Sequence, residues 1–215
     1  MMEKEPFENR MNKLAGRLTN IVLLGFFSLV CSLPVFTAGA AFTALYVSMK
    51  QYLKYEEDKV LRIYFPAFKE RFWISTKAFL VHLVLIAIFV WDLLYYRTGN
   101  STIDYIGQAG SFSLLMLSIF ELTVVFVVIG EELCENKVLV IIRTALDVAF
   151  SCFKESASLL GLTIAAIVIC VVLLRPFILV LPGVIAYLHY PIIEKMLERY
   201  RFQANHKQYL KREKK

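Results

Sequence analysis

The sequence predicts an all-α, polytopic membrane protein with about six transmembrane helices and both termini in the cytoplasm. Of the 215 residues, 58% are hydrophobic and the mean hydropathy is +0.60, whereas a soluble domain is about 45–50% apolar. Several apolar stretches approach the roughly 20 residues that a helix needs to cross a bilayer. Basic residues concentrate in alternate connections between these stretches. We therefore expect one membrane domain over 1–215, ending in a basic cytoplasmic tail over 195–215.

The charge distribution predicts the orientation of the spans, which we place near 19–36, 38–54, 77–96, 111–131, 157–174 and 177–194. Of the 24 Lys and Arg residues, 22 lie in the N-terminal segment, in segments 50–77 and 137–154 and in the tail. Only Arg97 and Arg175 lie in the other connections. Cytoplasmic loops of membrane proteins carry an excess of Lys and Arg, so both termini are expected in the cytoplasm. The net charge of +6 thus reflects topology, and we expect lipid rather than nucleic acid as the partner.

The first span raises the question of a signal peptide, because Ala38-Gly39-Ala40 after it imitates a cleavage site. Cleavage there would place a segment with seven basic residues outside, against the charge rule. The residues before the span are also acidic as well as basic. We therefore expect this span to remain uncleaved.

The second span contains polar residues and cannot face lipid all round. Its small residues recur every four positions in two rows, which lets helix backbones approach closely in a membrane. We expect an antiparallel hairpin with the first span, in which Pro34 ends the first helix and the Thr37 hydroxyl caps the next. An anionic group docked at that helix N-terminus is the alternative. The packing residues are Pro34, Thr37, Gly39, Ala40, Ala44 and Ser48.

Segment 56–76, EEDKVLRIYFPAFKERFWIST, alternates aromatic and charged residues. This pattern favours a helix in the cytoplasmic interface, interrupted by Pro66. It serves either as a docking surface for a partner or lipid, or simply as an anchor for the third span. The docking reading rests on Phe65, Phe68, Lys69, Arg71, Phe72 and Trp73.

Two further patterns concern the architecture. Phe65-x-x-Phe68-Lys69-Glu70 recurs 85 residues later as Phe150-x-x-Phe153-Lys154-Glu155, which is a short match to an internal repeat of the kind known in transporters. The last span contains Pro182, Gly183 and Pro191, so we expect a kink in its outer half.

Few ionisable residues fall inside the spans. Glu121 lies near the centre of the fourth span, and a carboxylate there is costly unless it is paired or protonated. His82 and Asp92 lie in the third span, and Arg175 lies at the outer mouth of the fifth. These residues form either a polar path with Glu121 as a proton or cation site, or structural pairs such as Asp92 with Arg175. The acidic residues that close the fourth span, Glu131, Glu132 and Glu135, are expected to be solvated.

Motifs of enzymes and metal sites are missing from the sequence. It contains no GxxxxGK[ST], GxGxxG, HExxH or GxSxG pattern, and its histidines and four cysteines are not spaced as metal ligands. We expect no enzymatic activity, no cofactor, no metal and no disulfide.

Residues 18–76 resemble the YesL-like family of small bacterial integral membrane proteins, defined as a domain of unknown function. The resemblance is carried by Asn20, Leu33-Pro34, Thr37-Ala38-Gly39-Ala40-Ala41, Ala44-Leu45-Tyr46 and Phe65-x-x-Phe68-Lys69. Arg71 departs from the family's Phe-Lys-x-Asn-Phe pattern, so its polar contact is expected to differ. The resemblance implies a multi-pass protein of the bacterial inner membrane, with genes often near carbohydrate-uptake systems, and supplies no catalytic residues.

Two functional hypotheses follow. The first is a non-enzymatic accessory or regulatory component associated with carbohydrate uptake or signalling, with a sugar permease or sensor kinase as partner. The second is a small secondary transporter or channel that uses Glu121. Substrate, partner identity and oligomeric state cannot be read from the sequence.

Overall fold

The computed structural model describes residues 7–55, 59–99, 101–173 and 179–213. Their regular structure is helical throughout, which confirms the all-α class. The helices are α1 (Phe7–Ser32), α2 (Ala38–Tyr55), α3 (Val60–Glu70), α4 (Phe72–Tyr96), α5 (Thr102–Gly130), α6 (Val138–Ser151), α7 (Phe153–Leu173) and α8 (Leu181–Glu213), with a short 3-10 turn, η1 (Val35–Thr37), between α1 and α2.

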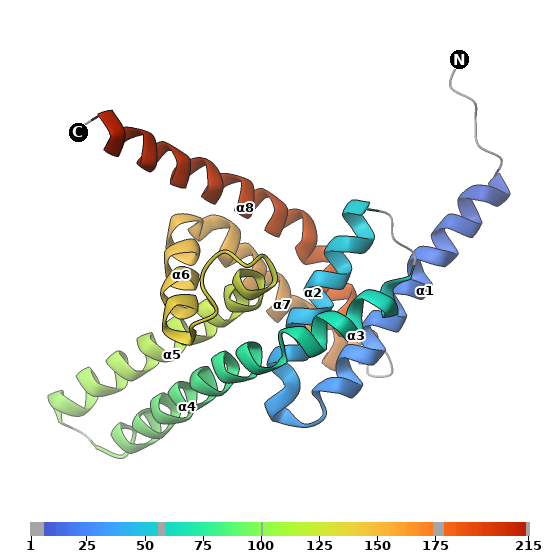
Figure 1. The fold of residues 1–215 in the computed structure, drawn as a ribbon. Helices are drawn as coiled ribbons and strands as arrows, with labels where there is room; N and C mark the ends of the chain where they lie inside the picture. The colour runs from blue at the N-terminus through green and yellow to red at the C-terminus, as the bar shows by residue number, and fades with distance from the viewer. Residues whose placement is uncertain (1–6, 56–58, 100, 174–178, 214–215) are drawn as a thin grey trace.

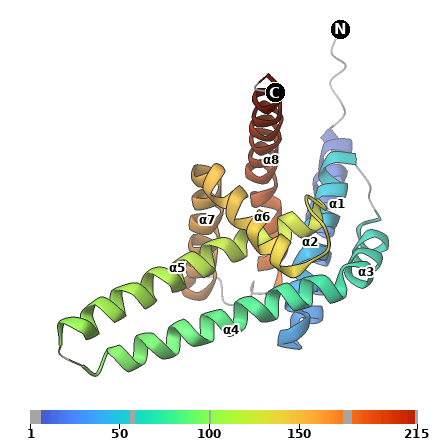
Figure 2. The same cartoon turned by 60° about the vertical axis from the view of Figure 1, so that its left-hand side comes forward.

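Four of these helices are long and apolar enough to cross a membrane: Ala15–Ser32 of α1, all of α4 and α5, and Phe153–Val172 of α7. In Figures 1 and 2 the start of α1 and the ends of α2 and α8 lie on one side of the molecule. The turn between α1 and α2 and the turn between α4 and α5 lie on the opposite side. Helices α1 and α2 therefore run in opposite directions, as do α4 and α5.

The centre of the molecule is α2, which packs against α1, α3, α4, α5 and α8. Eleven of its 18 residues are buried. This confirms that α2 cannot face lipid all round and needs neighbours, since its hydroxyl groups and lysines would be costly in hydrocarbon. The antiparallel hairpin of α1 and α2 is also confirmed.

The two rows of small residues on α2 serve different neighbours. Ala40, Ala44 and Ser48 are fully buried, and Ala44 belongs to a core cluster with Ile21 and Leu24 of α1. The other row, Gly39 and Thr43, meets α4. A Cβ on Gly39 would overlap the Ser75 backbone carbonyl. The Ser75 hydroxyl also donates to the Thr43 hydroxyl at 3.0 Å. Small side chains thus bring α2 close to two helices at once.

The turn between α1 and α2 begins where the sequence predicts, with α1 ending at Ser32 just before Pro34. The hydroxyl of Thr37 has a different role from the expected cap. It donates to the carbonyl oxygens of Pro34 at 2.7 Å and Cys31 at 2.5 Å. It therefore bonds carbonyl groups at the end of α1 and in the turn after it rather than an amide at the start of α2.

The interfacial segment forms α3, which runs through Pro66 without interruption and ends at Glu70. The expected break at Pro66 is therefore wrong: the chain bends at Arg71, and α4 begins at Phe72, five residues before the predicted span. We call the segment from Phe65 to Trp73 the elbow.

A second bend of the same kind occurs at Cys152, between α6 and α7. The Phe-x-x-Phe-Lys-Glu motif occupies a different position relative to each of the two bends. Phe68-Lys69-Glu70 precedes the bend at Arg71, whereas Phe153-Lys154-Glu155 follows the bend at Cys152. The two bends are 81 residues apart (152 − 71) and the motifs 85 (150 − 65). The helix–bend–span arrangement recurs, but the sequence motif does not mark it.

The last helix, α8, continues as one helix through Pro191 and includes much of the predicted tail. It crosses α1 at two glycines. A Cβ on Gly183 would overlap the Ile21 carbonyl oxygen, and a Cβ on Gly25 would lie 2.9 Å from the Gly183 amide nitrogen. The backbones of α1 and α8 thus meet at a point where no side chain fits.

We expect Gly183→Ala to destabilise the protein by about 1–3 kcal/mol, because the added methyl group must displace backbone rather than a flexible side chain. The matched control is Gly161→Ala, since a Cβ there meets nothing within 4 Å and Ala favours the helix by about 0.5–1 kcal/mol. Melting temperatures in detergent would measure both variants. Equal melting temperatures of the Gly183→Ala variant and the wild type would contradict a close crossing of α1 and α8 at these glycines.

Candidate functional site

The structure brings two of the predicted intramembrane residues together. His82 of α4 and Glu121 of α5 are both buried, and the imidazole Nε2 lies 3.5 Å from the Glu121 Oε2. Helices α4 and α5 pack side by side along this hairpin. Glu121 lies in the second half of α5 rather than at its centre, because α5 begins at Thr102, nine residues before the predicted span.

The hydrogen-bond partner of His82 restricts the protonation of this pair. The Nδ1 lies 2.9 Å from the Ala78 carbonyl oxygen, which can only accept, so we assign the hydrogen to Nδ1. The Nε2 then faces the carboxyl group of Glu121 either with a lone pair or with a second hydrogen. A favourable contact requires one proton between the two groups, as imidazolium with carboxylate or as imidazole with carboxylic acid.

Other buried polar atoms occur on α2, α4 and α5. The hydroxyls of Ser48 on α2, Thr76 on α4 and Ser118 on α5 have no hydrogen-bond partner among the described residues. The Nε2 of His82 and the Oε1 of Glu121 are also without one. Helices α2, α4 and α5 thus contain buried polar groups without hydrogen-bond partners. The polar-path hypothesis needs groups of this kind.

The two remaining members of the predicted polar site do not join this pair. Asp92 is half-buried on α4, ten residues beyond His82, which is about 15 Å along a helix. Arg175 lies outside the described residues. The pairing of Asp92 with Arg175 therefore stays a prediction.

A second cluster, which we call the Glu131 hub, joins the ends of three elements. Glu131, just after α5, accepts hydrogen bonds from the Tyr46 hydroxyl and the Lys50 ammonium, both at 2.6 Å. The guanidinium of Arg201 on α8 lies 3.1 Å from its other carboxylate oxygen. The side chain of Glu131 is only 3% exposed. The expectation of a solvated edge is therefore wrong for Glu131, although Glu132 and Glu135 are exposed.

The environment of Glu131 keeps it ionised. Burial alone would raise the pKa of its carboxyl group, but the hydrogen bonds from Lys50 and Tyr46 and the charges of Lys50 and Arg201 hold that pKa below its ordinary value of 4.5. The sequence contained one signal of this cluster. Tyr46 and Lys50 are four residues apart and share a face of α2, which is too buried to leave a lysine without a partner.

Arg71, predicted as a docking residue, points into the protein instead. Its guanidinium donates to the Gly130 carbonyl oxygen at 2.7 Å and to Glu132 at 2.6 Å. It thereby satisfies a backbone carbonyl at the end of α5, next to Glu132, which has a positive φ of 51°. Arg71 holds the elbow to the end of α5 and is a structural residue.

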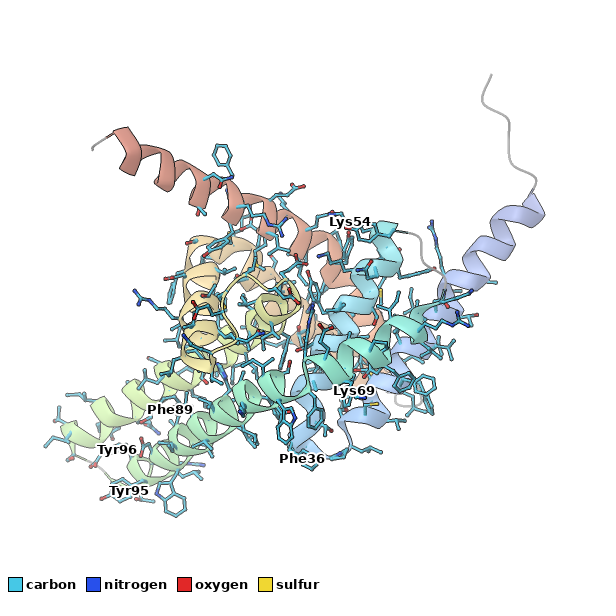
Figure 3. All side chains as sticks on the ribbon, viewed as in Figure 1. Phe36, Lys54, Lys69, Phe89, Tyr95 and Tyr96 are labelled. Carbon is cyan, nitrogen blue, oxygen red and sulfur yellow. The ribbon has the colours of Figure 1, made fainter. Side chains whose placement is uncertain are left out.

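The other predicted docking residues differ in exposure. Phe65 and Lys69 are exposed and Trp73 is 71% exposed, with Lys69 visible at the junction of α3 and α4 in Figure 3. Phe68 and Phe72 are half-buried. The ring of Tyr64 contacts those of Phe65 and Phe68, and the series continues through Phe72 to Trp73, with centroids 5.5–6.3 Å apart. The elbow is thus a packed aromatic strip with an exposed edge.

The comparisons with known proteins bear on this first half of the molecule. Residues 18–93 match the model of a family described as "Protein of unknown function, DUF624". The match covers 76 of the 215 residues (93 − 18 + 1). The match confirms the resemblance to YesL-like proteins, which are members of DUF624. No curated protein and no solved structure matches the chain.

The DUF624 segment accounts for only part of the two clusters. It contains α2, the elbow and most of α4, and so supplies Tyr46, Lys50 and His82. Glu121, Glu131 and Arg201 lie beyond it. Both buried charge contacts therefore join the DUF624 segment to the remainder of the chain.

Glu131→Gln should lower stability by about 2 kcal/mol, or about 4–8 °C in melting temperature for a protein of this size. The loss is smaller than for a fully buried ion pair because Lys50 and Arg201 remain partly solvated. The folded pKa of Glu131 is lowered, so its contribution is full above pH 4.5 and is lost as the pH falls through the folded pKa. The difference in melting temperature between the wild type and Glu131→Gln should therefore shrink in acid.

Glu135→Gln is the matched control, since Glu135 pairs with Lys137 at 2.7 Å on the surface, where both side chains are exposed. This variant should melt within about 1–2 °C of the wild type. An effect of Glu131→Gln no larger than that of Glu135→Gln would show that the hub does not stabilise the fold.

Proposed function

We propose that this protein is a non-enzymatic accessory or regulatory component of a membrane complex concerned with carbohydrate uptake or signalling. It would reside in the inner membrane of a bacterium, crossing six times with both termini in the cytoplasm. Its partner would be a sugar permease or a sensor kinase, docked on the elbow. The DUF624 match leaves the activity open, so the proposal rests on the chemistry of this surface.

The observation that supports the proposal is the exposed aromatic edge of the elbow. Phe65 and Trp73 present large exposed apolar surfaces, and Lys69, four residues from each in the sequence, is also exposed. Aromatic side chains dominate the energetics of protein interfaces, where a few of them supply most of the binding free energy. The edge lies at the start of a candidate span, at the level where a membrane partner and its cytoplasmic domains are both within reach.

The elbow is also held rigidly, which reduces the entropy lost when a partner binds. Arg71 ties the bend to the end of α5, and Val60, Tyr64 and Ala67 of α3 are buried against the rest of the protein. The exposed rings are therefore displayed on a fixed support. A helix that only anchored the next span would not need this attachment.

Docking at Trp73 can be tested with Trp91 as the control position. These are the two tryptophans of the chain, and both are exposed, at 71% and 74%. A photo-crosslinking amino acid at position 73 in the full-length protein, expressed in its native membrane, should yield a discrete adduct with a permease or kinase. Position 91 should not yield that adduct. Phe65→Ala should reduce its yield about fivefold or more, since loss of an aromatic anchor typically costs over 1 kcal/mol.

Two results would count against docking at the elbow. One is a protein recovered without any adduct from position 73. The other is an identical set of adducts from positions 73 and 91, which would indicate random contacts in the membrane.

A second candidate function, a small proton-coupled transporter or channel, is favoured by the pair of His82 and Glu121. Both side chains are buried, lie 3.5 Å apart and leave one polar atom each without a partner. Ionisable pairs at such positions in membrane proteins mark proton and ion pathways. The pair has the chemistry to hold one proton and release it when the two helices separate.

Proton flux into liposomes containing the purified protein tests this alternative. Glu121→Gln should abolish the flux, because an amide cannot release a proton. Glu132→Gln, in the exposed turn after the same helix, should leave it unchanged. Absence of flux from the wild type, or equal flux from Glu121→Gln, would exclude the transporter.

A further inference from the structure

The far end of the α4–α5 hairpin contains an amphiphilic groove that neither functional hypothesis uses. It has a volume of about 410 Å³ and opens to the surroundings between the two helices. Tyr95 and Tyr96 mark this end of the hairpin in Figure 3, on the side opposite the end of α8. The groove is lined by Leu93, Leu94, Arg97, Tyr105, Gln108, Ala109 and Phe112.

The lining separates into an apolar part and a polar part. Leu93, Leu94 and Phe112 continue the apolar surface of the two candidate spans. Arg97, Tyr105 and Gln108 supply one cationic group and two neutral hydrogen-bonding groups. The arrangement suits a molecule with an anionic head and a hydrocarbon body, and a soluble anion would not use the apolar part.

Arg97 is the charged group of the groove, and no acidic side chain among the described residues forms an ion pair with it. The side chain is exposed, and no ion pair or side-chain hydrogen bond is recorded for it among the described residues. The nearby acid Asp104 is engaged elsewhere, since its carboxylate accepts from the Ser101 hydroxyl at 2.6 Å and the Ser101 amide at 2.8 Å. A free guanidinium beside an apolar groove is complementary to a phosphodiester.

The neighbouring aromatic residues support a position at the membrane surface. Trp91 and Tyr95 on α4 and Tyr105 on α5 are all exposed. Trp and Tyr concentrate at the level of lipid headgroups, where the ring contacts hydrocarbon and the polar atom contacts water. This belt places the groove at the boundary between the lipid headgroups and the acyl chains.

We propose that the groove between the ends of α4 and α5 binds one anionic phospholipid, such as phosphatidylglycerol. The guanidinium of Arg97 donates to the phosphate oxygens, and Tyr105 and Gln108 hydrogen-bond the phosphate or the glycerol backbone. An acyl chain lies along Leu93, Leu94 and Phe112. The site is independent of the partner docked at the elbow and of the His82–Glu121 pair.

Trp91 supplies the probe for the test. It lies three residues before Leu94 and therefore near the same face of α4, and Trp73→Phe leaves it as the one tryptophan of the chain. The full-length Trp73→Phe protein is reconstituted in phosphatidylcholine bilayers containing a small fraction of brominated lipid, whose bromine atoms quench indole on contact. Brominated phosphatidylglycerol should be enriched near Trp91 about fivefold over brominated phosphatidylcholine, the preference that one basic residue near anionic lipid gives.

Two variants distinguish a site from general attraction of charge. In the same background, Arg97→Gln should abolish the preference for phosphatidylglycerol. Gln108→Leu, which leaves the charge unchanged, should reduce it about twofold or more. Lys77→Gln at the opposite end of α4 is the matched control and should keep the full preference. Inorganic phosphate in the buffer should not compete, because it lacks the hydrocarbon body.

Several results would overturn the proposal. Equal quenching by the two brominated lipids in the unmutated background would show that no anionic lipid is selected. A preference that survives Arg97→Gln would place the lipid elsewhere. A preference lost in Arg97→Gln but intact in Gln108→Leu would show attraction by charge without a groove, and competition by inorganic phosphate would show a site for the anion alone.

Discussion

The arrangement of the whole molecule depends on the burial of α2. This helix carries Thr43, Ser48 and Lys50, and in a bilayer such groups must be surrounded by protein or reach water. Five other helices pack around it, and its small residues let them approach closely. The more apolar helices α4, α5 and α7 then take the positions that face outward, as their exposed Leu, Ile and Val side chains indicate.

The polar groups of α2 also determine where the buried charges of the molecule gather. Lys50 and Tyr46 lie near the end of α2, so Glu131 at the end of α5 and Arg201 on α8 converge on them. The hub is a cross-link between segments that are up to 155 residues apart in sequence (201 − 46). Further along the hairpin, the pair of His82 and Glu121 joins α4 to α5 in the same manner. Each contact gives a buried carboxyl group a polar partner on another helix.

The two ends of the molecule consequently differ in character. At the end that includes the elbow and the hub, acidic and basic groups pair with each other and the exposed aromatic edge is the free surface. At the other end, the described turns carry a single basic residue, Arg97, without an acidic partner. An aromatic edge suits a protein partner, and a guanidinium without an acidic partner at the headgroup boundary suits an anionic lipid. The two proposed binding surfaces thus lie at opposite ends of the molecule. The unequal distribution of basic residues that predicts the topology also distinguishes these two ends.

The sequence by itself determined the helical class, the order of the helices, the α1–α2 hairpin and the burial of α2, because hydropathy, charge and small-residue spacing are local properties that act along one helix at a time. It also identified His82 and Glu121 as residues that need partners. Only the tertiary structure decided that they partner each other, that Glu131 is buried, that Arg71 turns inward, and that the chain bends at Arg71 rather than at Pro66. These outcomes depend on which helices meet and at what height, and a side chain's environment is set by neighbours that its own segment does not encode.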